Sequence, residues 1–429
     1  MTHFAVIAPP FHSHLRALEA ISCELIGRGH RLTFIQQADV RAALSHPGLQ
    51  FAAVGAASHP PGSMRAIISR AANPGGPWGL KRVIADLATA TDMLCREAPL
   101  VLSSLGVEAV IADQMEPAGA LVAESLGLPY VSVACALPFN REPRVPLPVM
   151  PWRYQATPWG EQLNLHSARV YDWMMRPHGD VIAAHAEAFG LVPRQTLSEC
   201  LSPLLQISQT PAGFDFPRQA LPDHVHAVGP LRLPLRDEPP LNVPIEARRP
   251  FVFASLGTLQ GHRFGLFQRI ARACRELDVQ LLLAHCGGLD GRQEQRLYQD
   301  GATWVTDFAP QRAVLANAQA VITHAGLNTV LDALEAGVPV LALPIAFDQP
   351  GVAARVEYTG VGLRLNHRLA RGRSLCSALS RLLGEPGFRE RAGALGRDVR
   401  LSGGAPRAAD LIEAAVRRNR PLVRGVDDL

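Results

Sequence analysis

The chain has 429 residues, of which 48% are hydrophobic and 19% charged, so two domains with large apolar cores are expected. The formal net charge of +4 is small for this length, and no basic block suggests a nucleic-acid partner. Seven scattered cysteines, without paired spacing, predict reduced thiols in a cytoplasmic protein rather than disulfides or a metal site. No apolar run is long enough to predict a membrane-spanning helix.

The first half begins with a strand–helix–strand pattern. Apolar residues 4–8 predict a buried strand, residues 14–28 an amphipathic helix and residues 32–35 the next strand. Further strands are predicted at 107–112, 130–134, 204–208 and 225–228, and a helix at 117–126. This alternation is typical of a parallel sheet, in which ligands collect at the carboxyl ends of the strands.

Two irregular stretches interrupt this pattern. Residues 58–77 are rich in Gly, Pro and Ser, and residues 137–158 are rich in proline. Four tryptophans lie in or beside them: Trp78, Trp152, Trp159 and Trp173. These side chains either anchor long loops to the core or form the wall of an apolar cleft. We favour the second interpretation, because tryptophans beside proline turns suit the rim of a pocket.

A linker and a second α/β unit follow. Proline-rich residues 231–250 read as the linker, and residues 251–255 as the first strand beyond it. Later elements are predicted at 264–277, 279–284, 304–305, 312–316, 374–383 and 405–418. The expected domains are an N-terminal domain at 1–232, a linker at 233–249, a C-terminal domain at 250–404, and a terminal helix and tail at 405–429.

The most informative stretch runs from Thr323 to Gln349. An apolar run ends at His324-Ala325-Gly326, a helical pattern begins at Leu327, and a second apolar run, residues 338–343, follows. A glycine turn lets a ligand approach the backbone, and the free N–H groups of the next helix favour an anion such as a phosphate. Asp348 and Gln349 then supply groups suited to sugar hydroxyls.

A resemblance emerges when Phe308-Ala309-Pro310-Gln311 is added upstream of that stretch. The order F-x-P-Q, H-x-G-x-N-T, G-V-P and D-Q resembles the donor signature of UDP-sugar-dependent glycosyltransferases. Over its whole length the chain resembles the bacterial zeaxanthin glucosyltransferases of carotenoid biosynthesis. The resemblance implies an α/β GT-B fold, two facing Rossmann-like domains with a cleft between them. It also implies transfer with inversion, no bound metal or cofactor, and UDP-glucose as donor substrate.

The predicted catalytic pair is His14 and Asp113. In the resembling family, a histidine stands before the first helix at a fixed distance from Gly-His, here Gly29-His30, which selects His14 over the fallback His12. The dipole of a helix start disfavours the cation, so the ring is expected to stay neutral and able to accept a proton. Asp113 matches the family position of its carboxylate partner. The alternatives are an ordinary turn histidine and a helix-capping aspartate.

The resemblance also assigns the donor site. For the diphosphate it indicates His324, Gly326, Asn328 and Thr329, with Ser255, Gly257 and Thr258. For the nucleoside it indicates Phe308, Gln311 and Asp332, and for the sugar Asp348 and Gln349. Relatives carry tryptophan in place of Phe308 and glutamate in place of Asp332. These two differences leave open whether the donor nucleotide is UDP or dTDP. The alternatives are an ordinary strand-ending turn at 255–258 and a polar loop at 348–349.

The function expected from these residues is glucosyl transfer to a carotenoid diol. A polyketide or flavonoid-like acceptor is an alternative, and a non-catalytic nucleotide-sugar-binding protein is an alternative of another class. An apolar hydroxylated acceptor would be met at a membrane surface, so peripheral contact at the inner membrane is left open, as is the oligomeric state. The basic tail either rests on anionic lipid or, as we favour, forms a solvated helix end: Arg417, Arg418, Arg420 and Arg424.

Overall fold

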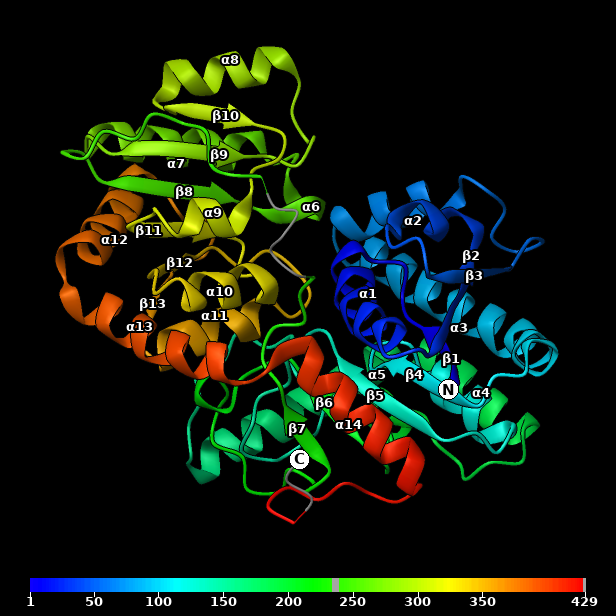
Figure 1. Ribbon diagram of the computed structural model, residues 1–429. Helices are drawn as coiled ribbons and strands as arrows, with labels where there is room; N and C mark the ends of the chain where they lie inside the picture. The colour runs from blue at the N-terminus through cyan, green and yellow to red at the C-terminus, as the bar shows by residue number, and fades with distance from the viewer. Residues whose placement is uncertain (234–238, 427–429) are drawn as a thin grey trace.

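The computed structural model describes residues 1–233 and 239–426, which form two facing α/β units (Figure 1). Residues 234–238 of the predicted linker lie outside the described residues. In the described chain the first unit has a seven-stranded sheet of order β3-β2-β1-β4-β5-β6-β7, and the second a six-stranded sheet of order β10-β9-β8-β11-β12-β13. Neighbouring strands pair in parallel, so the expected fold of two Rossmann-like domains is confirmed.

Most strands fall close to their predicted positions, but β3 and β13 were not predicted. Those of the first sheet are β1 (His3–Ile7), β2 (Arg31–Gln37), β3 (Gln50–Val54), β4 (Ala109–Asp113), β5 (Tyr130–Ala134), β6 (Gln206–Ser208) and β7 (Val225–Ala227). Those of the second are β8 (Phe251–Ser255), β9 (Gln280–Ala284), β10 (Trp304–Thr306), β11 (Ala320–Thr323), β12 (Val340–Ala342) and β13 (Gly362–Arg364).

Helices cover both faces of each sheet. In the first unit they are α1 (His12–Gly27), α2 (Ser63–Ala72), α3 (Pro77–Leu105), α4 (Ala118–Ser125) and α5 (Pro158–Ala188). In the second they are α6 (Gly257–Gln260), α7 (Phe264–Glu276), α8 (Gly291–Asp300), α9 (Gln311–Leu315), α10 (Leu327–Glu335), α11 (Gln349–Tyr358), α12 (Gly372–Gly384) and α13 (Pro386–Leu401), and the chain ends with a further helix, α14 (Gly404–Arg418). Short 3₁₀ turns lie at Ala38–Ala43, Leu197–Cys200 and Ala212–Phe214.

The core follows from the alternation of side chains along β1. Phe4 and Val6 pack on one face of the first sheet, with α1, whereas Ala5 and Ile7 pack on the other, with α3 and α4. Since both faces are covered by helices, every residue of β1 is buried, which explains its continuous apolar run.

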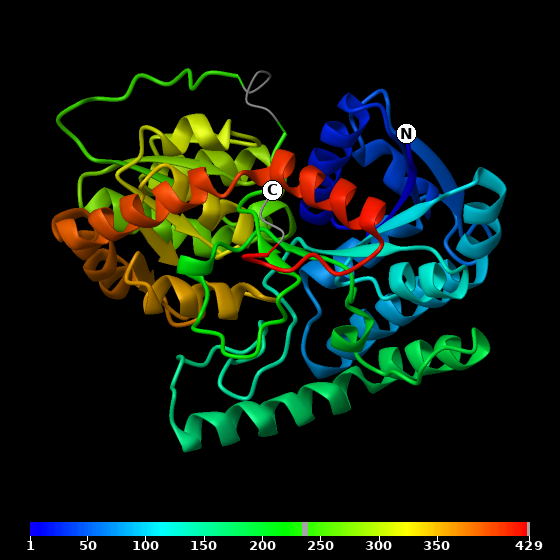
Figure 2. The same cartoon turned by 60° about the horizontal axis from the view of Figure 1, so that its bottom comes forward.

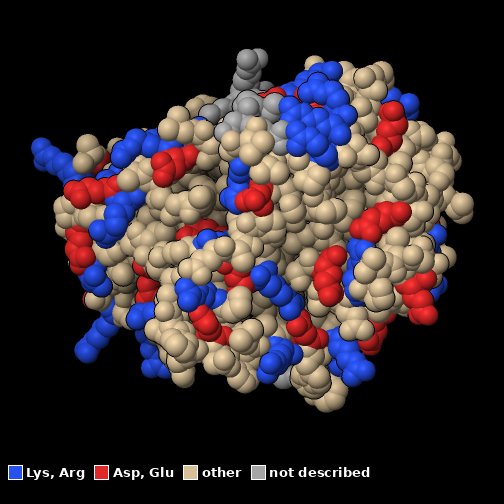
Figure 3. All heavy atoms as spheres, turned by 90° about the horizontal axis from the view of Figure 1, so that it is seen from below, with Lys and Arg blue, Asp and Glu red and all other residues tan. Residues whose placement is uncertain are grey.

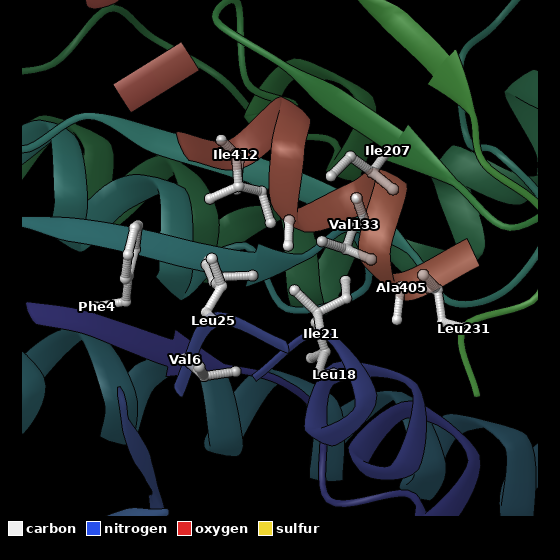
Figure 4. Close-up of a cluster of buried hydrophobic side chains, with 14 of the residues drawn as sticks. Phe4, Val6, Leu18, Ile21, Leu25, Val133, Ile207, Leu231, Ala405 and Ile412 are labelled. Carbon is white, nitrogen blue, oxygen red and sulfur yellow. The ribbon is translucent and has the colours of Figure 1, made fainter. Parts of the chain in front are cut away.

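The last helix returns to the first domain. Helix α14 lies against α1, and its Ala405 and Ile412 join the cluster that contains Leu18 and Ile21 (Figure 4). Arg28, at the end of α1, pairs with Asp410 at 2.6 Å and Glu413 at 2.7 Å. The chain therefore ties the two domains together twice, through the linker and through α14.

Two irregular stretches predicted from the sequence differ in outcome. Residues 137–157 contain no helix or strand, as expected. The interpretation of residues 58–77 was wrong in part, because α2 occupies their middle.

The surface seen from below shows both signs of charge interspersed (Figure 3). No helix among the described residues is both long and apolar enough to cross a bilayer.

Candidate active site

The two predicted catalytic residues lie side by side. Strands β1 and β4 are neighbours in register, with Ile7 opposite Ala112, so the helix after β1 and the end of β4 meet at one edge of the sheet. There His14 Nδ1 lies 2.7 Å from Asp113 Oδ2. The other carboxylate oxygen, Oδ1, accepts the Met115 amide at 2.8 Å, which fixes the plane of the carboxylate. The Asp113 side chain is fully buried, whereas that of His14 is 14% exposed, so the ring can still reach a substrate.

The protonation of His14 differs from the sequence expectation. Burial lowers the pKa of its ring, but the charge and hydrogen bond of Asp113, together with the charge of Asp348, outweigh burial and raise the pKa above its usual value. Two nearby carboxylates thus favour the cation, an effect opposite to the one expected from the helix dipole. His12 is exposed at the start of the helix, and the carboxylate of Asp113 engages His14 instead.

Cys135 is a neighbour of this pair that the sequence did not indicate. It follows β5, which is paired with β4, and its Sγ lies 3.9 Å from the His14 carbonyl oxygen. The thiol is buried, and burial together with the charge of Asp113 raises its pKa well above the usual value, so it remains protonated. A neutral thiol closes the side of the pair that faces the core.

In the second domain, His324 is seated between two glycines. Ser255 at the end of β8 lies opposite Thr323 of β11, so the turns that follow these strands face each other. A Cβ atom at Gly257 would lie 2.6 Å from His324 Cε1, and one at Gly326 would lie 2.5 Å from Nε2. Both positions therefore require glycine to admit the ring. Burial lowers the pKa of His324 to about 4, although a hydrogen bond with the Ser255 backbone opposes this shift.

The start of α10 offers unpaired amide groups. Ala325 is buried with φ of 64°, a left-handed conformation that costs a non-glycine residue about 1–2 kcal/mol, and it turns the chain sharply into the helix. Gly326 is the N-cap residue and supplies no side-chain cap, so the first N–H groups of the helix have no partner within it. Thr258 is exposed on the facing turn. These donors suit a diphosphate.

Of the residues predicted for the nucleoside, Gln311 and Asp332 are hydrogen-bonded to each other, whereas Phe308 is not part of this group. Gln311 Nε2 donates to Asp332 Oδ2 at 2.5 Å, and Thr329 Oγ1 donates to Gln311 Oε1 at 3.2 Å. Asp332 is 6% exposed, whereas Phe308 is 69% exposed and presents its ring to solvent. The structure thus brings together two of the three predicted nucleoside residues, Gln311 and Asp332, joins them to Thr329 of the predicted diphosphate group, and leaves the ring of Phe308 exposed.

Two side chains from the first domain reach this group, and sequence reasoning missed both. Arg232 Nε donates to Asp332 Oδ1 at 2.9 Å, and its Nη2 donates to the Asn328 carbonyl oxygen at 3.0 Å. Gln209 Nε2 donates to Asn328 Oδ1 at 3.0 Å. Neither residue belongs to a local motif, because Gln209 follows β6 and Arg232 lies in the proline-rich segment, so only the tertiary fold reveals them.

Asp348 lies where the two domains meet. Burial raises the pKa of its carboxyl group, although the nearby charge of His14 opposes the shift, and its Oδ2 lies 3.5 Å from the Leu137 amide. Gln349 has a different position from the one expected. Its Oε1 accepts the amides of Ile345 and Ala346 at 2.9 and 2.8 Å, so this oxygen closes the loop, and the predicted contact with a sugar hydroxyl would fall to the Nε2 donors.

The domains are held in contact around these residues. Arg355 of α11 is fully buried, and its Nε and Nη2 lie 2.7 and 2.6 Å from Asp215 Oδ1. Its guanidinium also stacks 4.2 Å from the centre of the Phe216 ring. Near His14, the rings of Phe11 and Phe347 approach to 6.2 Å across the junction. The candidate base and the predicted sugar carboxylate therefore lie near each other at this junction, where their charges interact.

The tryptophans do not form a common wall. Trp78, Trp159 and Trp173 are 80%, 65% and 73% exposed, so they do not anchor loops to the core either. Trp173 lines a cavity of about 260 Å³ together with Phe139 and Tyr171. Charged side chains line the same cavity, among them Arg141, Asp172 and Asp180, so the predicted apolar cleft stays a prediction, while Trp78 and Trp159 face solvent.

Comparison with known proteins agrees with this geometry. The sequence profile of the family described as UDP-glucoronosyl and UDP-glucosyl transferase matches residues 97–398. The chain is 50% identical to the zeaxanthin glucosyltransferase of Pantoea ananas, covering 99% of this chain and 98% of that protein. It is 48% identical to the zeaxanthin glucosyltransferase of Pseudescherichia vulneris, covering 97% and 98%. Among solved structures, the glycosyltransferase of kitacinnamycin superposes with a TM-score of 0.76 at 20% identity over 97% of this chain and 99% of that one, which supports the fold alone.

Proposed function

This chain belongs to the UDP-glucoronosyl and UDP-glucosyl transferase family, and we propose that it transfers glucose from UDP-glucose to the ring hydroxyls of a carotenoid diol such as zeaxanthin. Both ends of the diol would react in turn, each with inversion at the anomeric carbon. The observation that carries the proposal is the His14–Asp113 pair of the first domain, close enough to Asp348 of the second domain for their charges to interact.

The chemistry begins with the acceptor. His14 Nε2 takes the hydroxyl proton as the oxygen attacks the anomeric carbon of glucose, and the bond from that carbon to the β-phosphate oxygen breaks. Asp113, on the other ring nitrogen, holds the tautomer that exposes Nε2 and stabilises the imidazolium that forms. Because Asp113 is already in place, this stabilisation requires no rearrangement during the reaction.

The leaving diphosphate receives negative charge as the bond breaks. The N–H groups at the start of α10 face this charge together with the positive end of the helix dipole. His324, whose pKa lies near 4, is neutral at physiological pH and would act through a hydrogen bond rather than a full charge. The proposed site uses only side chains and amides, so transfer is expected to persist in the presence of a chelator.

The acceptor rests on two kinds of support. The relatives at 50% and 48% identity are named for zeaxanthin, and they align with nearly the whole chain, including the N-terminal domain. An apolar cluster that includes Phe139, Leu147 and Tyr171, with Met115 packed against it, lies next to Asp113. A long apolar polyene with a hydroxyl group on its terminal ring suits such a site. We place the reaction in the cytoplasm, on the inner side of the membrane that would hold the acceptor.

The test is to incubate the protein with UDP-glucose and zeaxanthin dispersed in detergent and to measure product masses. We expect mono- and diglucosides, none with His14→Ala, and little product when dTDP-glucose replaces UDP-glucose. Parallel reactions contain a flavonoid and a macrolide aglycone. Faster transfer to either of these would replace the carotenoid with the other acceptor class, and binding of UDP-glucose without turnover on any acceptor would identify a binding protein.

A further inference from the structure

The outer face of helix α5 carries large apolar side chains without a packing partner in the described chain. Trp159, Val170 and Trp173 are 65%, 56% and 73% exposed. Their spacing of 11 and 3 residues places them on one side of a helix with 3.6 residues per turn, and exposed His166 lies between them on the same side. This stripe runs along a helix at the periphery of the molecule, seen at the lower edge of Figure 2.

The fold itself does not require this stripe. Buried residues of α5, such as Tyr171 and Ile182, face the core, and His178 Nε2 lies 2.9 Å from Thr91 Oγ1 of α3. Helix α5 is therefore held by its inner face. Two tryptophans and a valine on the outer face remain in water, which is unfavourable unless another surface covers them.

The charges beside the stripe favour an anionic partner. Glu161 and Asp172 are each neutralised by an arginine of the preceding loop, Arg144 and Arg141, both at 2.6 Å. Arg169 is exposed on the stripe side, and Arg176 is paired only loosely with Asp180, at 3.9 Å. Tryptophan rings flanked by arginines are the combination that suits the headgroup region of a bilayer.

The stripe is continuous with the cavity of about 260 Å³ described above. Trp173 and Arg176 also line that cavity, and Phe139 and Tyr171 form its apolar wall beside the charged side chains of Arg141, Asp172 and Asp180. The Phe139 amide donates to Gln114 Oε1 at 3.1 Å, and Gln114 directly follows Asp113. An apolar molecule that enters at Trp173 would therefore be next to the backbone that carries the catalytic carboxylate.

We propose that the outer face of α5 docks on a lipid bilayer with anionic headgroups and that the adjoining cavity takes the apolar acceptor from it. The docking stands on the exposed residues alone. Only the delivery of acceptor through the cavity rests on the proposed function. Trp159 and Val170 bind lipid in this arrangement, whereas Trp173 belongs to the mouth of the cavity.

The first test is co-sedimentation of the full chain with vesicles of phosphatidylcholine alone or mixed with phosphatidylglycerol. The double variant Trp159→Ser/Val170→Ser should bind mixed vesicles at least about tenfold more weakly than the wild type, because both anchors are lost. Trp78→Ser, which removes an equally exposed tryptophan from α3, is the matched control and should bind as the wild type does. Arg169→Gln should weaken binding to mixed vesicles only.

Equal binding of the double variant and the wild type would overturn the proposal. So would a wild-type dimer in solution that the double variant converts to monomer while vesicle binding stays unchanged, since the stripe would then be covered by a second copy. Transfer to zeaxanthin in vesicles should fall in the double variant, while transfer in detergent stays normal. A wild type that glucosylates zeaxanthin in neither medium would refute the proposed acceptor but leave the sedimentation result to decide the docking.

Discussion

Arg232 Nε donates to Asp332 Oδ1 at 2.9 Å. A residue that follows the last strand of the first sheet therefore holds a carboxylate of the second domain. The same guanidinium donates to the Asn328 carbonyl oxygen at the start of α10. Asp332 is one methylene shorter than the glutamate of the resembling family, and its two oxygens are already engaged by Arg232 and Gln311. We therefore predict that donor recognition depends on a residue outside the donor domain.

Arg232→Ala should raise the KM for UDP-glucose about tenfold, since hydrogen bonds to charged groups contribute about 1.5–3 kcal/mol each and part of this holds Asp332 in place. The kcat at saturating donor should change little, because Arg232 is not placed at the reacting atoms. Initial rates over a range of UDP-glucose concentrations measure both constants. Arg292→Ala, an exposed arginine of α8, is the control. A lower KM would mean that Arg232 blocks the ribose position instead of organising it.

The strand ends and their functional turns could be predicted from the sequence, whereas Arg232 and Gln209 could not. Thr323 to Leu327 forms a local strand–turn–helix pattern, and such patterns depend on neighbouring residues alone. The contacts of Gln209 and Arg232 join residues about a hundred positions apart or more, and no periodicity indicates them. The hydrogen bonds of Gln349 to its own loop could not be predicted either, because they depend on the path of the backbone.

The long helix α5 was missed for a different reason. It begins at Pro158, after Thr157, whose side chain accepts the Gly160 amide at 3.1 Å. Proline in the first turn is a start signal for a helix, but a proline-rich stretch before it reads as loop. Pro177 inside the helix also suggests an end rather than a continuation. The face that we propose to meet lipid was therefore not visible from the sequence pattern.

The pH dependence of transfer should report the Asp113 carboxylate. Asp113 raises the pKa of His14, so Asp113→Asn should lower that pKa and move the acid limb of kcat/KM to lower pH. The rate itself should fall by about 10²–10⁴-fold, because the imidazolium loses its partner. Profiles of kcat/KM between pH 5 and 9 measure both effects. An unchanged acid limb would show that another group is the base.

The position of the His324 ring can be changed without replacing His324 itself, which tests its predicted role. Gly326→Ala places a Cβ 2.5 Å from the ring nitrogen while φ of −62° remains acceptable to alanine, so the ring and not the backbone must move. We expect the KM for UDP-glucose to rise about tenfold, equivalent to about 1.4 kcal/mol of binding. Gly265→Ala adds a methyl group with no neighbour within 4 Å and is the control. Identical donor kinetics in the two variants would argue against a diphosphate role for His324.

Glu116 should make stability depend on pH. Its carboxyl is buried, which raises its pKa to about 7 although hydrogen bonds from Thr91 and Ala118 oppose the shift. A folded-state pKa above the unfolded value favours the fold at low pH, and this advantage is lost as pH rises from about 4.5 to 7, by about 3 kcal/mol in total.

Glu116→Gln keeps an oxygen that can accept both hydrogen bonds but does not titrate. Its stability relative to the wild type should therefore increase between pH 5 and pH 8, as measured by urea unfolding at each pH. A constant offset caused by the extra amide donors would not affect this slope. A difference that stays the same at every pH would contradict the buried, titrating carboxyl.

Among the arginines whose side chains cross the domain junction, the loss of Arg355 should lower the free energy of unfolding most. Arg355→Met leaves the buried Asp215 with Arg218 alone, and removing one partner of a buried pair costs about 3–5 kcal/mol. Arg153→Met is the matched control, because Arg153 also pairs with a carboxylate of α11, Glu357, but is 70% exposed, and its loss should change stability little. Urea unfolding at pH 7 measures both.

The sign of the pH effect gives a second check on this pair. Although burial raises the pKa of Asp215, the charges of Arg355 and Arg218 lower it below the usual value. Its stabilising contribution is therefore present above the unfolded pKa near 4 and is lost as pH falls through the folded value. The difference between wild type and Arg355→Met should accordingly shrink in acid. A loss of stability equal to that of Arg153→Met at pH 7 would show that the two domains do not depend on Arg355.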